Sequence, residues 1–448
     1  MKTLYANNDI LAKLKGHLLP FFDGFTKPTA RTLIWMVIAM LVLGGVQSVR
    51  NLHTDFLADL DLVSLNTLYH ALSYAKRPLK RAFDRVIARM LFRAVPTHLR
   101  GCPVFLCVDD TLVPKFGRKF DWVGTLFDHA AHDGKPYKNA HCFVCIALAV
   151  PAGTDPKTGT PRYLSVPLRL CLWKKGGPSK LQIAHDILLD LRSSLQELGN
   201  YVLLADSWYP KKDLLRILDE WAGLQFIGAV RSDSEIYDLP PKRTGKRGRP
   251  RKYGQRLRPS DFTLRSSGLK GYDAGCRPVL ASIFGYRQVT AFVTCPSEGG
   301  ARRLYLSTMT CHDVKRLAGS AIQYCEQEHE QFIPLFLYRQ RWTIEVIFLE
   351  LKVYWSLESY MVRNEDAIDL LLNLIVVAYS LTKLLPYVDT DFHEWQELST
   401  QQTRLRLGKL ISRRIFLWHL SQELQSGENP CGFEKSFTSV LRKFASLS

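Results

Sequence analysis

The sequence predicts an α/β protein with a mixed β-sheet flanked by helices, a β-rich insertion and an N-terminal helical domain. Three observations support this fold class. Residues 1–97 show helical patterns, residues 98–230 alternate between strand-like and helical segments, and residues 231–302 contain short alternating segments with turn residues between them. A chain of 448 residues is long enough for about two to four domains.

The first predicted domain, residues 1–97, is helical. Its most apolar stretch, residues 33–46, covers 14 residues, whereas a membrane span needs about 20, so it predicts a buried helix. A later helix, residues 64–73, can begin at Ser64 as its N-cap. Helices joined by a short break are compatible with a helix-turn-helix-like DNA reader or with a helical dimerisation module.

The second predicted domain, residues 98–230, has the order β-β-β-α-β-α-β. This order predicts a mixed sheet covered by helices. The strand-like runs are residues 103–110, 141–150, 163–173, 201–206 and 225–230, and the helical runs are residues 181–198 and 211–222.

The pattern loosens after residue 230. We expect a β-rich insertion over residues 231–302, because a Pro-, Gly- and Lys/Arg-rich loop opens it and short alternating segments follow. Residues 303–385 are predicted to return to the main sheet and to complete it with helices. Residues 386–448 read as a helical C-terminal tail.

The composition indicates a polyanionic partner. The chain carries 60 basic and 42 acidic residues, a formal net charge of +18, which favours nucleic acid. Its cysteines lie mostly in apolar runs, as reduced, buried thiols do. The first 20 residues lack the apolar region of a secretory signal. We therefore expect a cytoplasmic protein that does not bind membranes.

Acidic residues follow two of the predicted strands. Asp109 and Asp110 close the first strand, and Asp206 closes the fourth. Functional groups in α/β sheets gather beyond the carboxyl ends of strands, so these carboxylates are expected to meet. Such a cluster repels itself unless a cation neutralises it, and carboxylate oxygens suit Mg²⁺. The sequence leaves open whether Asp109 or Asp110 is the ligand.

The stretch YRQRWTIEVIFLELK, residues 338–352, predicts one helix with a functional stripe. At 100° per residue its four polar side chains lie within about 60° of one another, beside an apolar face that must be buried. The purely structural interpretation is an Arg341–Glu345 ion pair on a helix surface, with no role in a site. The alternative is that Glu345 joins the aspartates at a metal site and the cations hold DNA phosphates. The four residues are Tyr338, Arg341, Glu345 and Lys352.

A basic stretch, residues 246–252, lies in the predicted insertion. Its Gly-Arg-Pro core is that of an AT-hook, in which extended arginines lie in a narrow A·T minor groove. The alternative is a loop that contacts phosphates without sequence preference. Both interpretations imply DNA. The arginines concerned are Arg247, Arg249 and Arg251.

These features together resemble bacterial insertion-sequence transposases of the DDE class, which have an RNase H-like catalytic domain. The spacing Tyr-x2-Arg-x3-Glu-x6-Lys marks one cut-and-paste group, and residues 338–352 match it without a gap. The predicted strand order is also similar to that of the RNase H-like core. The resemblance covers about residues 100–385. It implies that Asp109, Asp206 and Glu345 hold the metals.

The resemblance implies DNA cleavage and strand transfer with two Mg²⁺ ions, for which Mn²⁺ can substitute. The expected partner is double-stranded DNA, both the element ends and the target. The protein is expected to bind this DNA as a homodimer and to associate with the bacterial nucleoid. Hairpin-forming relatives stack a flipped base on a Trp of the insertion, which residues 231–300 lack. Tyr272, Tyr286 or Phe284 could take that role. The alternatives are an RNase H-like nuclease without strand transfer and a non-catalytic DNA-binding regulator derived from a transposase.

Overall fold

The computed structural model describes residues 10–44, 48–60, 62–74, 79–128, 134–195, 199–241, 251–320 and 322–425, the side chains of residues 74, 79–82 and 419–425 aside. The chain forms two compact units, each built from separate segments. We call residues 91–111 and 142–347 the sheet unit. We call residues 1–90, 112–141 and 348–448 the helical unit. This grouping does not test the five segments expected from the sequence, which stay predictions.

The strands of the main sheet follow the predicted runs closely. Their β-branched and apolar side chains are almost all buried, as strands covered on both faces require. One short strand, β2, was not predicted. The strands before the insertion are β1 Val104–Pro114, β2 Gly124–Phe127, β3 Tyr137–Thr154, β4 Pro161–Trp173, β5 Tyr201–Ala205 and β6 Gln225–Val230.

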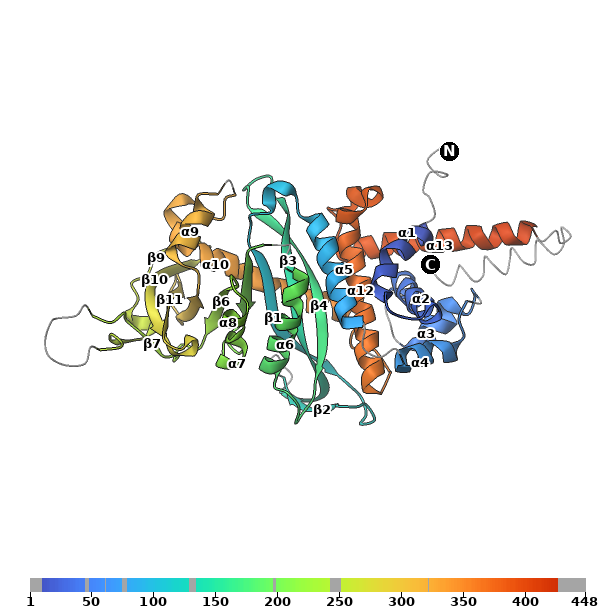
Figure 1. Ribbon diagram of the computed structural model, residues 1–448, viewed down its shortest axis with the longest axis horizontal. Helices are drawn as coiled ribbons and strands as arrows, with labels where there is room; N and C mark the ends of the chain where they lie inside the picture. The colour runs from blue at the N-terminus through green and yellow to red at the C-terminus, as the bar shows by residue number, and fades with distance from the viewer. Residues whose placement is uncertain are drawn as a thin grey trace. The chain divides into compact units, whose positions relative to one another are not determined.

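The sheet has a mixed topology with a parallel centre. Strand β1 pairs with β5 in parallel and β5 with β6 in parallel, while β3 and β4 pair antiparallel. The spatial order is β3-β1-β5-β6, with β4 beyond β3. Helix α6, Lys180–Leu195, connects β4 to β5 and packs on β4, and Figure 1 shows it in green beside β1 and β4. This confirms the predicted RNase H-like mixed sheet flanked by helices.

Two short helices make the second crossover. A single helix over residues 211–222 was predicted, but the structure has α7, Lys212–Leu215, and α8, Ile217–Glu220. They connect β5 to β6, which keeps both strands parallel, because parallel neighbours need a crossover between them.

The predicted β-rich insertion continues the main sheet on the far side of β6. Strand β12, Arg303–Ser307, pairs antiparallel with β6, as predicted for the return to the sheet. Beyond it follow β11, Arg287–Pro296, and β10, Tyr272–Ala281. The remaining elements are β7 Ile236–Tyr237, β8 Arg256–Leu257, η5 Pro259–Asp261, β9 Arg265–Ser266 and η6 Ser282–Phe284. Figure 1 shows these strands in yellow and green beside β6.

The motif region is not one helix, as predicted, but three consecutive helical segments. Helix α10, Ile333–Tyr338, passes into a 3-10 turn, η8 Arg339–Arg341, and then into α11, Trp342–Tyr354. A tightened 3-10 turn changes the angle between residues on either side of it. The predicted apolar face of α11 is buried, since Ile344 and Ile347 are both 0% exposed. Two further helices precede it, α9 Cys311–Ala318 and η7 Gln327–Phe332.

The helical unit packs around two apolar helices. Helix α2, Lys27–Leu43, contains residues 33–43 of the stretch predicted to be buried, and residues 45 and 46 of that stretch lie outside the described residues. The helix is capped by Gly44, whose φ of 72° suits glycine. It contacts α12, Glu365–Val388, and α13, Thr400–Gln425. Among the described residues α12 alone is long and apolar enough to cross a membrane, but 89% of that window is buried in the protein, as in a core helix.

The remaining helices of the chain are short or amphipathic. Helix α4 buries Leu68 and Leu72 while Asn66 and Thr67 are exposed, so its polar face is open for the predicted DNA contact. The DNA-reading and dimerisation interpretations both stay predictions. The elements are α1 Ile10–Leu18, η2 Leu19–Phe22, α3 Val49–Leu52, the π-helical η3 His53–Leu57, α4 Leu65–Tyr74, α5 Leu79–Ala94, η4 Thr97–Leu99 and η9 Thr390–Trp395.

Candidate active site

The register of β1 and β5 brings two of the predicted acids together. Val108 of β1 is paired with Ala205 of β5, so the next residues along these parallel strands, Asp109 and Asp206, lie side by side. Strand β5 ends at Ala205, so Asp206 follows it at the edge where functional groups collect, whereas β1 continues to Pro114 and Asp109 lies within that strand rather than closing it as predicted. The sheet therefore positions two carboxylates from residues 97 positions apart in sequence.

Asp109 is the acid most strongly perturbed by this placement. Its pKa is raised to about 7, first because burial disfavours the charged carboxylate and then because the negative charge of Asp206 adds to that effect. The backbone N–H of Asp110, 2.8 Å from Oδ1 of Asp109, and the nearby Arg341 act in the opposite direction. The two carboxylates repel each other, which favours a bound cation.

The third predicted acid, Glu345, is linked to Asp109 by an arginine that contacts both carboxylates. The Arg341 guanidinium forms an ion pair with Glu345, one helical turn along, and its Nη1 lies 3.5 Å from Oδ2 of Asp109. The sequence interpretation had Arg341 holding DNA phosphate rather than neutralising Glu345. In the structure it compensates both acids, because two partly buried carboxylates require a positive charge beside them.

The donor set fits a divalent cation in its chemistry. Carboxylates from Asp109, Asp206 and Glu345 are the hard oxygen ligands that Mg²⁺ and Mn²⁺ prefer. Their oxygens do not all lie within 4.8 Å of one another, whereas among the described residues Glu326, Glu328 and His329 do form such a group. That second group is a buried histidine beside two largely exposed glutamates, and Nε2 of His329 lies 3.1 Å from Oε1 of Glu328.

Asp110, the rival first acid, has other partners. Its Oδ1 accepts a hydrogen bond from the Tyr209 hydroxyl at 2.9 Å, and its Oδ2 lies 2.7 Å from Nζ of Lys180. The Cys142 thiol donates to the same Oδ2 at 3.3 Å. Successive side chains of a strand point to opposite faces, which explains why two neighbouring aspartates have separate surroundings. The geometry therefore favours Asp109 over Asp110 as the metal ligand.

The other two members of the motif contact the backbone. The Tyr338 hydroxyl donates to the carbonyl of Ala205 at 3.2 Å, directly before Asp206, and burial raises the pKa of this phenol. Nζ of Lys352 donates to the Leu112 carbonyl at 2.8 Å and lies 3.2 Å from Glu358. Tyr338 therefore contacts the end of β5 and Lys352 the backbone of β1, and phosphate contacts by either stay a prediction.

The insertion offers only part of the expected DNA-contacting set. Arg247 and Arg249 lie outside the described residues, and Arg251 is exposed. Phe284 is 8% exposed and so is unsuited to stacking on a base, whereas Tyr272 and Tyr286 are 41% and 38% exposed. The AT-hook and base-stacking interpretations remain predictions.

Three residues next to the acids were not predicted as site residues. Lys180 begins α6 and contacts Asp110, and Lys211 follows β5. Trp208, expected from its position after Asp206 to shape the wall of the site rather than to stack on DNA, donates its backbone N–H to Oδ1 of Asp206 at 3.0 Å. The sequence signal was weak, since a lysine after a glycine-rich loop has no motif to identify it.

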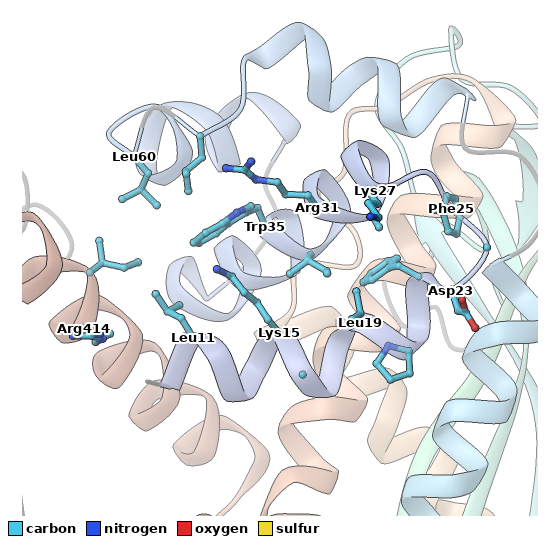
Figure 2. Close-up of a pocket in the computed structure, with 18 of the residues that line it drawn as sticks. Leu11, Lys15, Leu19, Asp23, Phe25, Lys27, Arg31, Trp35, Leu60 and Arg414 are labelled. Carbon is cyan, nitrogen blue, oxygen red and sulfur yellow. The ribbon is translucent and has the colours of Figure 1, made fainter. Parts of the chain in front are cut away.

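The helical unit contains a separate cavity of about 990 Å³. Figure 2 shows Leu11, Lys15 and Leu19 on one side of it and Arg31 and Trp35 on another. Nζ of Lys15 lies 4.8 Å from the Trp35 ring centroid. Its lining combines apolar side chains with the basic residues Lys15, Lys27, Arg31 and Arg414. It lies in the unit that includes the predicted DNA-reading helices.

Comparison with known proteins identifies the family. A family model described as DDE superfamily endonuclease matches residues 20–268, more than half of the chain, and this range includes Asp109 and Asp206. No curated protein matches the chain significantly. A solved structure, the Drosophila P element transposase strand transfer complex, is similar at 12% identity and a TM-score of 0.24, over 100% of this chain and 96% of that one. A likeness at that level establishes no shared fold. The chain belongs to the DDE superfamily endonucleases on the strength of the family match.

Proposed function

We propose that this endonuclease is a DNA transposase that binds the ends of its own element and catalyses metal-dependent strand cleavage and strand transfer. The observation that supports this most is the register of β1 and β5, which sets Asp109 beside Asp206. The Arg341 link from Asp109 to Glu345 adds the third acid of the motif.

Asp109, Asp206 and Glu345 are the residues that would hold the metal, and Mg²⁺ is the proposed ion with Mn²⁺ as a substitute. When bound, a pair of such ions supplies activation of the attacking hydroxyl and stabilisation of the leaving oxygen. The chain's own contribution is to hold three carboxylates on rigid elements. Asp109 must be deprotonated to bind a cation. Its pKa of about 7 in the metal-free chain places this loss of the proton near neutral pH.

Arg341 and the other basic residues of the motif would receive the DNA. A guanidinium that leaves the carboxylates can form a bidentate contact with phosphate, because its planar fork fits both groups. Lys352 would serve as a second phosphate contact and Tyr338 would keep the end of β5 in place. Arg247, Arg249 and Arg251 would extend the contact along the duplex.

The proposed partner is double-stranded DNA, both at the element ends and at the target. The net charge of +18 favours it, and neutralising phosphates releases counterions, so binding should weaken steeply with salt. Transposition holds two ends together, so a homodimer on DNA is proposed. The polar face of α4 is the candidate reader of the end sequence.

The test uses DNA that contains the flanks of the gene, with one labelled strand. Wild-type protein with Mg²⁺ should nick that DNA at a defined position and then join the freed 3′ end to a target plasmid. Nicking without joining would support the nuclease without strand transfer. Binding without nicking by a protein that fails to bind Mg²⁺ would support the non-catalytic regulator.

A further inference from the structure

Two lysines converge on one exposed indole directly beside Asp206. Nζ of Lys211 lies 4.3 Å from the ring centroid of Trp208, and Nζ of Lys180 lies 5.3 Å from it. Both distances are those of cation–π contacts. Trp208 is 38% exposed, so this group faces solvent rather than the core.

The group is fixed by a closed set of contacts around Asp110. The Trp208 ring packs against Tyr209 at a centroid distance of 5.0 Å, and the Tyr209 hydroxyl donates to Asp110. Lys180 reaches the other oxygen of the same carboxylate. The backbone N–H of Trp208 is held by Asp206. Asp110 therefore fixes the position of Lys180 directly. It also fixes the Trp208 indole, on which Lys211 packs, through the hydrogen bond from Tyr209.

Both ammonium groups keep the capacity to bind an anion. An ammonium group has three N–H donors, and Asp110 takes one of those on Lys180. Burial opposes the charge on Lys180, but its pKa is nevertheless raised by Cys142 and the Asp110 carboxylate. Lys211 is exposed. Lys180 and Lys211 therefore both keep N–H donors that can bind an anion beside Asp206.

We propose that Lys180, Trp208 and Lys211 form a phosphate-binding subsite for the DNA strand that enters the active site. The two ammonium groups would pair with backbone phosphates beside the scissile one. Trp208 is a positioning residue that holds both lysines through its ring. The subsite rests on the proposed function, since DNA is the polyanion concerned. It gives Asp110 a role distinct from metal binding.

The salt dependence of DNA affinity tests this subsite without knowledge of the element ends. Fluorescence anisotropy with a random-sequence duplex gives the slope of log K against log salt, whose magnitude falls by about 0.9 for each phosphate that the protein no longer neutralises. Lys211→Gln and Lys180→Gln should each reduce the slope by about that amount. Trp208→Ala should reduce it by about twice as much, whereas Trp208→Phe should keep most of it.

Lys157→Gln is the matched control, with the same change in charge. Lys157 is exposed in the turn before β4, at the opposite end of that strand from Trp173, which lies 5.9 Å from Nζ of Lys180. A strand of this length spans roughly 40 Å. When the nicking rate is measured, Lys211→Gln should raise the KM for DNA by a larger factor than it lowers kcat. Lys157→Gln should change neither.

The outcomes separate the subsite from the function it depends on. If the wild-type chain binds DNA and Lys211→Gln has the same slope as Lys157→Gln, the subsite is wrong and the proposed function stands. If the wild-type chain shows no salt-dependent affinity for DNA, both are wrong. Lys211 is exposed, so Lys211→Gln should fold, and a thermal unfolding scan checks that it does. The Lys211→Gln result therefore tests the subsite even if Trp208→Ala fails to fold.

Discussion

Nη1 of Arg341 lies 3.5 Å from Oδ2 of Asp109, on a guanidinium that also forms an ion pair with Glu345. One cation therefore compensates two of the three acids proposed to bind metal. Arg341 and a divalent ion would neutralise the same carboxylates, which predicts that the two are energetically coupled.

Replacing Arg341 by glutamine should destabilise the protein and make Mg²⁺ more stabilising. Removing the cation leaves Asp109 and Glu345 without compensation, which costs about 1–3 kcal/mol for partly exposed groups. Urea unfolding with and without saturating Mg²⁺ measures both effects, because an ion that binds only the folded state stabilises it. Equal Mg²⁺ stabilisation of wild type and variant would contradict the coupling.

Stability without divalent ions should fall as pH rises from about 4 to about 7, through Asp109. The ordinary pKa of this carboxyl is 3.8 and its folded value is about 7. Between them the folded state retains a proton that the unfolded state has released, so the folded state binds more protons and loses stability as pH increases.

Asp109→Asn isolates this contribution, because the amide has no proton to lose. Urea unfolding at pH 5 and pH 8 should show a larger loss for wild type than for Asp109→Asn. The same loss in both proteins would mean that Asp109 titrates at its ordinary pKa in the folded state.

Substitutions of the two neighbouring aspartates should have different effects on Mg²⁺ binding. Asp109→Asn should abolish Mg²⁺ binding in calorimetry, whereas Asp110→Asn should retain it and weaken DNA affinity instead, because Asp110 holds Lys180 and Tyr209. Tyr209→Phe controls for removal of a single hydrogen bond of about 1 kcal/mol. Loss of Mg²⁺ binding in Asp110→Asn with wild-type binding in Asp109→Asn would reverse the assignment.

A side chain at Gly228 should destabilise the strand that supports the second acid. A Cβ there would lie 2.3 Å from the buried ring of Phe226 and 3.2 Å from the carbonyl oxygen of Ala205, the residue before Asp206. Gly228→Ala should therefore cost about 1–3 kcal/mol in urea unfolding. Gly153→Ala, where nothing lies within 4 Å, is the control and should change stability by less than about 0.5 kcal/mol. Equal losses of stability would show that the structure around Gly228 can relax.

The meeting of Asp109 and Asp206 could be expected from sequence, although the two residues are 97 positions apart. Each comes directly after an apolar strand-like run, and functional groups in α/β sheets gather beyond the carboxyl ends of such strands. The continuation of β1 to Pro114, past Asp109, was not predicted. The buried face of α11 was predictable in the same way, from the spacing of Ile344 and Ile347. Local pattern was enough in both cases.

Contacts between distant residues were not predictable. The return of β12 to the main sheet was predicted, but its pairing with β6, which makes the insertion a continuation of that sheet, was not, because it joins residues 74 to 80 positions apart, from Val230 with Leu304 to Ile227 with Ser307. The 3-10 turn at Arg339–Arg341 breaks a pattern that reads as one regular helix. The partnership of Lys180 with Asp110 joins residues 70 positions apart, for which a single sequence holds no signal.

The most direct measurement is the rate at which Glu345→Gln nicks DNA that carries the flanks of the gene, compared with wild type at saturating Mg²⁺. We predict a loss of at least about 100-fold in nicking while DNA affinity stays within about twofold of wild type, because the substitution removes one carboxylate of the metal site and no phosphate contact. Nicking by Glu345→Gln at the wild-type rate would contradict the three-acid site.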